Sequence, residues 1–377
     1  MKKIILIILF LLFVVAIVSI SKNNKTEEEF RDPIKIGWVS GMTGTSSKYG
    51  TFEAGKMAMD EINAAGGING RPLEIIFEDG QCKGTVAAQA ANKLINIDNV
   101  KIILGGHCTP ESAAIQPIAE KNKVLLFASV TSSPTMSNIG EYFFRTTSIS
   151  TIQSYILANK AYNDLNLRNI AVYYEQTDYA EPIAEKFKEE FEKLGGNISV
   201  FEGFAPETND FRTSLTKAKV NNVDGIFMSP QRPDAGINLV KQIAELNLNV
   251  QLFGNDIMSG EYIVSDLAEY VEGMLVASPE YDEENNPKSK KFAESYYENY
   301  GVANPFGVFT AESYDAVYII AEAIEKYGED IEKIKDYLSH LKNYDGVSGK
   351  ISIDENHDGV REYSLKSVKN GTLEKVQ

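Results

Sequence analysis

Short apolar runs alternate with amphipathic stretches from Pro33 onward, and this alternation restricts the fold more than any other feature of the chain. Near-continuous apolar runs predict strands buried on both faces, and strands of this kind that alternate with helices form parallel sheets. We therefore expect an α/β fold with sheets flanked by helices. The strand candidates are Ile34–Ser40, Leu73–Asp79, Lys101–Gly105, Val124–Ala128, Asn169–Glu175, Val223–Ser229 and Gln251–Gly254, and the helix candidates include Glu53–Ala64, Val86–Asn96, Glu181–Leu194 and Gly236–Leu246.

The pattern divides into two sets of units, which predicts two lobes. With 377 residues the chain is longer than a single core usually organises. The first set runs to about Arg145 and the second begins at Asn169, with the polar stretch Thr146–Thr151 between them. After about Val276 helices dominate, and a β-rich tail begins at Lys350. We interpret these as returns to each lobe, which gives 34–150 plus 280–347 for lobe one and 151–279 plus 348–377 for lobe two.

The N-terminus carries an export or anchoring segment. Lys2 and Lys3 precede an uninterrupted apolar run, Ile4–Val18, as in the charged and hydrophobic regions of a signal peptide. The run is also close to the length that spans a membrane. Residues 1–21 are therefore predicted to be either a signal peptide or a membrane anchor, followed by a linker over 22–33, and in both cases the remaining chain is extracytoplasmic.

Charge and cysteine content narrow the partners and the compartment. A formal net charge of −16 repels phosphate backbones, which argues against nucleic acid as a partner. Cys82 and Cys108 are the only cysteines, and an even count in an exported chain predicts a disulfide, with two buried thiols as the alternative.

Motifs for catalysis and cofactors are missing from the sequence. It contains no Gly-x-Gly-x-x-Gly, phosphate loop, Gly-x-Ser-x-Gly or His-Glu-x-x-His pattern. The pair His107-Cys108 has no zinc-like spacing to the two other histidines. The segment Asp354–Gly359 matches the first half of a calcium loop, but position twelve is Leu365, so a polar turn is the alternative. We predict a non-enzyme without a cofactor or metal.

Hydroxyl and acidic residues follow the predicted strands, at the sheet edge where ligands bind in open parallel sheets. Thr109-Pro110 opens a helix after one strand, and Ser132-Ser133-Pro134 repeats the arrangement one unit later. Both patterns predict helix caps, and two such termini could also hold a carboxylate. Asp256 follows Gln251–Gly254 and could neutralise an ammonium group, unless it is a surface or capping acid.

One long motif resembles a known family. Tyr49-Gly50 and the stretch Asp60–Arg71, which reads DEINAAGGINGR, resemble the first unit of the periplasmic leucine/isoleucine/valine-binding proteins of ABC transporters. The similarity continues in order through the chain, at Phe77–Asp79, Gly106–Cys108, Phe144–Thr146, Glu312–Tyr318 and Tyr344–Ile351. The resemblance implies a two-lobed type I periplasmic binding protein with three interlobe crossovers that closes on an amino acid or related solute and delivers it to a permease.

The resemblance also implies roles for individual residues. Cys82 and Cys108 fall where some members have a disulfide. The expected ligand contacts are a hydroxyl for the carboxylate at Thr109, a hydroxyl at Ser132, a backbone carbonyl for the ammonium at Val130, cleft tyrosines at Tyr49 and Tyr179, and the ammonium-pairing acid at Asp256.

This chain departs from the family pattern at two places. Ser150 stands where many members have an acid, and Gln231-Arg232 stands where aromatic residues usually flank an aliphatic ligand. Arg232 near the pocket would disfavour a purely aliphatic ligand and favour an acidic or amide-bearing one, unless it points to solvent. The alternative function is a membrane-anchored ligand sensor with the same fold.

Overall fold

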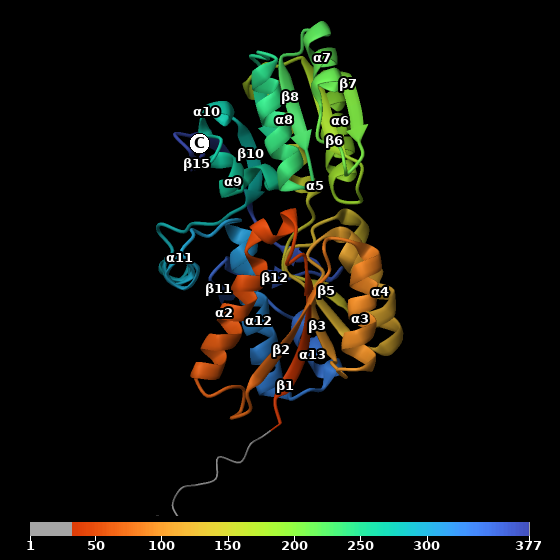
Figure 1. Cartoon of the computed structure of the whole chain (residues 1–377), viewed down its shortest axis with the longest axis vertical. Helices are drawn as coiled ribbons and strands as arrows, with labels where there is room; N and C mark the ends of the chain where they lie inside the picture. Colours follow the sequence, from red (N-terminus) through yellow and green to blue (C-terminus); the bar gives the residue numbers. More distant parts are fainter. Residues whose placement is uncertain (1–31, 377) are drawn as a thin grey trace, which may run out of the picture.

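The computed structural model describes residues 32–376, which fold into two lobes stacked along the long axis of the molecule (Figure 1). Each lobe contains a sheet with helices packed on it, which confirms the predicted α/β class. The predicted signal peptide or anchor over 1–21, and most of the linker over 22–33, lie outside the described residues. Within 32–376, no helix is both long enough and apolar enough to cross a bilayer.

Lobe one is built on a parallel sheet with the strand order β2-β1-β3-β4-β5. A small antiparallel sheet of β11, β12 and β13 adjoins it. Its elements are β1 (Ile34–Ser40), η1 (Thr45–Tyr49), α2 (Thr51–Ala64), β2 (Leu73–Asp79), α3 (Gly84–Asn96), β3 (Ile102–Gly105), α4 (Thr109–Asn122), β4 (Leu125–Ala128), η2 (Pro134–Met136), β5 (Phe143–Arg145), α11 (Pro287–Tyr300), α12 (Val308–Tyr327), α13 (Ile331–Ser339), β11 (Tyr344–Gly346), β12 (Gly349–Ile353) and β13 (Gly359–Val360).

The sheet of lobe one is covered on both faces because successive side chains on a strand point in opposite directions. Ile36 and Trp38 of β1 belong to a core shared with α2, α12 and α13. Val39 belongs to a second core, shared with α3 and α4. Both faces being buried explains why β1 is almost wholly apolar rather than alternating.

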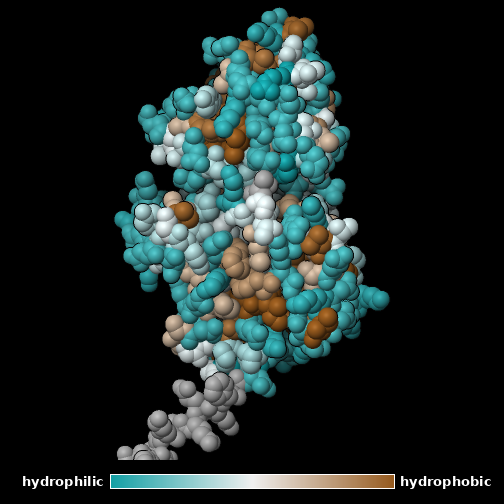
Figure 2. All heavy atoms as spheres, viewed as in Figure 1, coloured by the Kyte–Doolittle hydropathy of each residue, from teal (hydrophilic) through white to brown (hydrophobic). Residues whose placement is uncertain are grey.

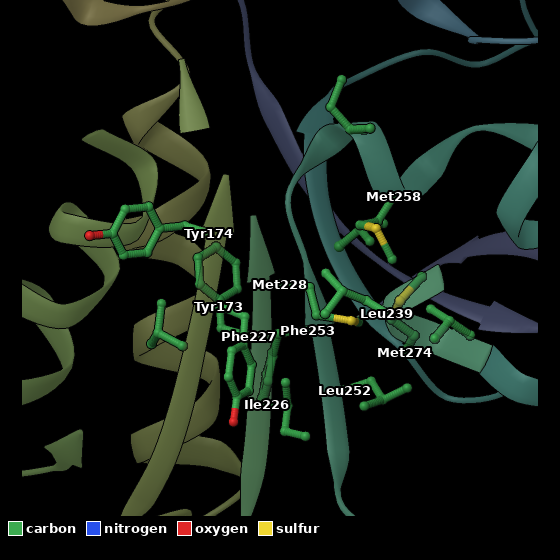
Figure 3. Packing of buried hydrophobic residues seen from close by; sticks show 14 of the residues in the cluster. Tyr173, Tyr174, Ile226, Phe227, Met228, Leu239, Leu252, Phe253, Met258 and Met274 are labelled. Atoms are coloured by element: carbon green, nitrogen blue, oxygen red, sulfur yellow. The ribbon is translucent and has the colours of Figure 1, made fainter. Parts of the chain in front are cut away.

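Lobe two contains a mixed sheet with the order β15-β14-β10-β9-β8-β6-β7, in which only β14 and β15 run antiparallel to their neighbours. Side chains of β6, β8 and β9, including Tyr173, Phe227 and Phe253, pack side by side in its core (Figure 3). Its elements are α5 (Thr151–Asn159), η3 (Lys160–Asp164), β6 (Asn169–Glu175), α6 (Ala180–Lys193), β7 (Asn197–Phe204), α7 (Arg212–Val220), β8 (Gly225–Ser229), α8 (Pro233–Glu245), β9 (Gln251–Gly254), η4 (Asp256–Ser259), α9 (Glu261–Val264), α10 (Ala268–Val271), β10 (Leu275–Pro279), β14 (Tyr363–Lys369) and β15 (Thr372–Lys375).

The chain passes between the lobes along adjacent segments. Gly359, the first residue of β13, donates its N–H to the carbonyl of Thr147, just after β5, at 3.1 Å. A Cβ at Gly359 would lie 1.9 Å from the carbonyl oxygen of Thr146, so only glycine lets the two backbones approach this closely. The segment that follows β5 and the segment that leads from β13 to β14 are therefore hydrogen-bonded to each other. We call this pair of segments between the lobes the strap.

The C-terminal tail enters lobe two later than the predicted boundary at residue 348. Ile351 and Ile353 of β12 are buried in the core of lobe one, and β12 pairs with β11. The tail joins the sheet of lobe two only at β14. The alternating pattern of β12 marks a strand correctly, but a strand pattern does not say which sheet the strand joins.

Candidate ligand-binding site

A cavity lies between the two lobes, where the carboxyl ends of both sheets face each other. The surface in Figure 2 is largely hydrophilic and narrows at this level, between the lobes. The lining side chains come from loops after β1, β3 and β4 in lobe one, from loops after β6, β8 and β9 in lobe two, and from the segment before and at the start of α12. The lining residues are Tyr49, His107, Cys108, Thr109, Val130, Thr131, Ser132, Tyr179, Gln231, Asp256, Ile257, Phe306 and Phe309.

Thr109 presents an unpaired hydroxyl at the start of α4. The sequence predicted that Thr109 would cap this helix, but it is the first helical residue, Cys108 is the N-cap, and the Thr109 Oγ1 atom is buried without a protein partner. The cap is made instead by Glu111, whose carboxylate accepts hydrogen bonds from the N–H groups of Cys82, His107 and Cys108 at 2.8–2.9 Å. The Thr109 hydroxyl is thus free for a ligand at the positive end of a helix dipole.

The loop after β4 contributes Val130 and Ser132 to the cavity lining, facing lobe two. Arg145 holds this loop in place through hydrogen bonds. The Arg145 guanidinium donates to the carbonyls of Thr131 and Ser133 at 3.0 and 2.8 Å. The same guanidinium pairs with Asp358 at 2.7 Å. Both charges are buried, so each requires the other. The buried pair holds this wall of the cavity in one conformation.

Lobe two contributes a buried carboxylate at Asp256. The Tyr179 hydroxyl donates to its Oδ1 atom, while its Oδ2 atom is buried without a protein partner. The Asp256 N–H donates to the side-chain oxygen of Gln153 at 2.8 Å. Burial raises the pKa of Asp256 to about 6, because removing a carboxylate from water disfavours its charged form. A cation bound at Oδ2 would restore the charged form.

Tyr49 forms an aromatic wall that joins the two lobes. Its ring stacks on His107, with 4.7 Å between centroids, and packs against Phe306 at 4.5 Å. Its hydroxyl donates to the carbonyl of Gln231 in lobe two at 2.8 Å. Burial lowers the pKa of His107 to about 3, which keeps the imidazole neutral.

Arg232 does not line the cavity. Its guanidinium pairs with Glu175 at 2.8 Å and with Asp234 at 2.7 Å, and it also donates to the carbonyl of Thr208. The expectation that Arg232 acts on the ligand therefore does not match its position, because two neighbouring acids hold it on lobe two. The neighbouring residue, Gln231, takes the place in the cavity instead.

Several cavity residues were not among the ligand contacts predicted from the sequence. Most of these residues are apolar or adjoin a predicted contact in the sequence. Ile257 directly follows Asp256, and Phe306 and Phe309 lie far along the chain from every other lining residue. Phe306 and Phe309 reach the carboxyl edge of the sheet of lobe one because the chain returns to that lobe after β10. Local sequence patterns do not predict where a returning segment packs. Gln231 did carry a signal, because it belongs to the pair Gln231-Arg232, where the resemblance implied a departure from the family pattern.

Cys82 and Cys108 form the predicted disulfide, beside the cavity. In residues 32–376 no cluster of histidine, cysteine and acidic side chains could hold a metal ion. In the half-match to a calcium loop, Asp354 accepts hydrogen bonds from the N–H groups of Asn356 and Asp358, and Asp358 pairs with Arg145. This segment is a polar turn between β12 and β13.

Comparison with known proteins identifies the family. A model of the periplasmic binding protein family matches residues 33–372. The leucine-, isoleucine-, valine-, threonine- and alanine-binding protein of Pseudomonas aeruginosa is 30% identical over 331 residues, which cover 87% of each chain.

Solved structures agree with this comparison. The leucine binding protein of Thermotoga maritima has a TM-score of 0.83 and 29% identity, covering 91% of this chain and 98% of the other. A branched-chain amino acid transporter substrate binding protein of Streptococcus pneumoniae, solved in complex with isoleucine, has a TM-score of 0.84 and 28% identity, covering 92% and 99%. Since the family match extends over nearly the whole described chain, the chain belongs to the periplasmic binding protein family.

Proposed function

We propose that this protein is an extracytoplasmic receptor that binds an α-amino acid between its lobes and delivers it to an ABC transporter. The observation that carries the proposal is a pair of buried, unpartnered polar atoms in the lining of one cavity. Thr109 Oγ1 belongs to lobe one and Asp256 Oδ2 to lobe two. One is a hydrogen-bond donor at the positive end of a helix, and the other is an anion-forming oxygen.

These two groups match the two ends of an amino acid. A carboxylate is stabilised by the Thr109 hydroxyl and the dipole of α4, with Ser132 beside it. An ammonium is stabilised by the Asp256 carboxylate and by the carbonyl of Val130. Unpaired buried polar groups are costly, so a ligand that pairs both ends at once gains affinity from each.

The binding step we propose is hinge closure. The solute contacts the hydroxyl groups of lobe one first, and rotation about the strap at Thr147 and Gly359 then brings Tyr179 and Asp256 onto it. The Tyr49–Gln231 hydrogen bond forms only when the lobes meet. A permease that recognises the closed arrangement would thereby distinguish loaded receptor from empty receptor.

Relatives support the partner class. The named relatives are binding proteins, and one of them is described as part of a branched-chain amino acid transporter. We propose that residues 1–21 direct export and then are either removed or retained as an anchor at the membrane where the permease lies. N-terminal sequencing of the mature protein separates the two forms.

The test is calorimetry on a Glu29–Gln377 protein that has been unfolded and refolded to strip ligand, titrated with the common L-amino acids. A selective amino acid should bind, and its α-hydroxy acid and its carboxamide, which lack the ammonium and the carboxylate, should bind at least tenfold more weakly. A well-folded sample that binds no amino acid contradicts the proposal. Equal affinity for the α-hydroxy acid would contradict the role of Asp256.

A further inference from the structure

Gln231 supplies to the cavity a buried polar side chain whose oxygen atom has no protein partner. Its backbone is fixed on both sides, because its N–H donates to Glu175 at 2.8 Å and its carbonyl accepts from Tyr49. Its Nε2 atom lies 3.6 Å from the Cys82 sulfur, in lobe one. Its Oε1 atom is buried and has no protein partner.

His107 supplies a second polar atom of this kind. Its Nδ1 atom lies 2.9 Å from the Thr51 hydroxyl, while its Nε2 atom is buried without a protein partner. Both residues contact Tyr49, His107 through ring stacking and Gln231 through its backbone carbonyl. Gln231 and His107 are therefore both neighbours of Tyr49, and Tyr179 and Asp256 are joined to each other.

The lining of the cavity also contains apolar groups. The Phe306 ring packs on Tyr49, and Ile257 and Phe309 line the same cavity. No cationic side chain lines it, and Asp256 is its one carboxylate among the described residues. A charged ligand side chain would have no counterion there beyond Asp256, which the α-ammonium occupies, so it would carry a desolvation penalty.

An aliphatic side chain would fit the apolar groups but leave Gln231 Oε1 and His107 Nε2 unpaired. A buried polar atom without a partner loses the hydrogen bonds that water gave it. A hydroxyl or carboxamide on the ligand would pair with these atoms while its aliphatic stem contacts Phe306. Either end of the Gln231 carboxamide requires a polar partner, whichever end faces the cavity.

We propose that the preferred ligand is an amino acid with a short, neutral side chain that carries a hydroxyl or carboxamide, and that Gln231 selects it over the aliphatic side chain of the same shape. This inference rests on the proposed function and specifies the ligand class at the same site. It differs from the aliphatic amino acids of the two solved relatives described above, one a leucine binding protein and the other solved with isoleucine.

Two isosteric pairs of ligands test the proposal directly. L-threonine and L-valine differ by a hydroxyl in place of a methyl group, and L-asparagine and L-leucine by a carboxamide in place of a branched terminus. Calorimetry on the stripped wild-type protein should find the tightest of the four to be a polar member, bound at least tenfold more tightly than its apolar partner. If an apolar member is the tightest, the ligand class is wrong while the amino acid receptor stands. If none of the four binds but another L-amino acid does, the ligand class is wrong while the receptor stands, and if no common L-amino acid binds, both proposals fail.

Variants at Gln231 identify the residue responsible. Gln231→Met keeps the length of the side chain but removes its hydrogen-bonding groups, so the polar-to-apolar affinity ratio should fall at least tenfold. Gln176→Met is the matched control, because Gln176 is exposed and also follows a strand of lobe two. An unchanged ratio in a folded Gln231→Met protein would overturn the assignment. The wild-type comparison decides the ligand class even if that variant does not fold.

Discussion

The Tyr49 hydroxyl donates a hydrogen bond of 2.8 Å to the backbone carbonyl of Gln231, although the two residues are 182 positions apart and belong to different lobes. Both are buried. Because this bond crosses the cleft, it exists only in the closed arrangement. Its free energy therefore contributes to closure and not to the stability of either lobe.

Tyr49→Phe should weaken ligand binding roughly 3- to 10-fold, since it removes one net hydrogen bond from the closed state and leaves the ring in place. The loss should appear mainly as faster ligand release, measured by stopped-flow fluorescence. Tyr297→Phe is the control, because Tyr297 is an exposed tyrosine on α11. Equal release rates in wild type and Tyr49→Phe would show that the bond does not hold the lobes closed.

Ligand affinity should fall at acidic pH. Burial raises the pKa of Asp256 from 3.8 to about 6. An ammonium group pairs only with the ionised carboxylate, so the dissociation constant should rise by up to about tenfold for each pH unit below 6. Calorimetry between pH 7.5 and pH 4.5 measures this slope. Asp256→Asn should bind more weakly throughout and lose the slope; the same slope in this variant would assign the effect to another group.

The same shift has the opposite effect on the ligand-free fold. Between about pH 4 and pH 6 the folded protein binds a proton at Asp256 that the unfolded chain has released, so this group's contribution to stability declines as the pH rises through that window. Urea unfolding of stripped wild type and Asp256→Asn, compared at pH 4.5 and pH 7, checks the sign. A larger gain in stability for wild type than for the variant on raising the pH would contradict it.

Replacing both cysteines by serine should lower the free energy of unfolding by about 3–4 kcal/mol, the loop-closure value for cysteines 26 residues apart. Because Gln231 lies against Cys82 and Thr109 follows Cys108, ligand affinity should fall as well. Urea unfolding and calorimetry measure the two effects. Full affinity in a folded double variant would show that the bridge stabilises the lobe without shaping the cavity.

Arg145→Met should lower the free energy of unfolding by about 3–5 kcal/mol, because it leaves the Asp358 carboxylate buried without its partner. Lys288→Met removes an exposed ion pair with Asp345 and should cost less than about 1 kcal/mol. Urea unfolding distinguishes the two. Arg145→Met should also weaken ligand binding, since Thr131 and Ser133 lose their donor; similar losses for both variants would contradict the role of burial.

Much of the fold could be predicted because its strands are buried on both faces and read as apolar runs. The predicted ranges for β1, β2, β6 and β9 coincide with the observed ones. In contrast, β5 has three residues, and only two of the eight residues of β7 are buried, so neither gives an apolar run of sufficient length. The placement of β12 in lobe one depends on long-range packing, which local patterns do not encode.

The site was predictable where it follows strand ends and unpredictable where neighbours decide the direction of a side chain. Thr109 and Asp256 follow parallel strands and line the cavity as expected. Arg232 follows a strand too, but Glu175 and Asp234 turn it away, and Glu175 is more than fifty residues distant in sequence. The sequence did not reveal that the Thr109 hydroxyl is unpaired, because Thr109-Pro110 matches a helix-capping pattern. In the structure the Glu111 side chain makes this cap instead.

The position of α12 has a consequence for the order in which the protein can be made. Val317, Ile320 and Ile324 fill one face of the sheet that β1 begins, so the first lobe to be synthesised lacks part of its core until the ribosome has passed Tyr327. The core of lobe one therefore stays incomplete until α12 has been made. If residues 1–21 direct export, as proposed, late completion of the first core keeps lobe one in a state that can still cross a membrane.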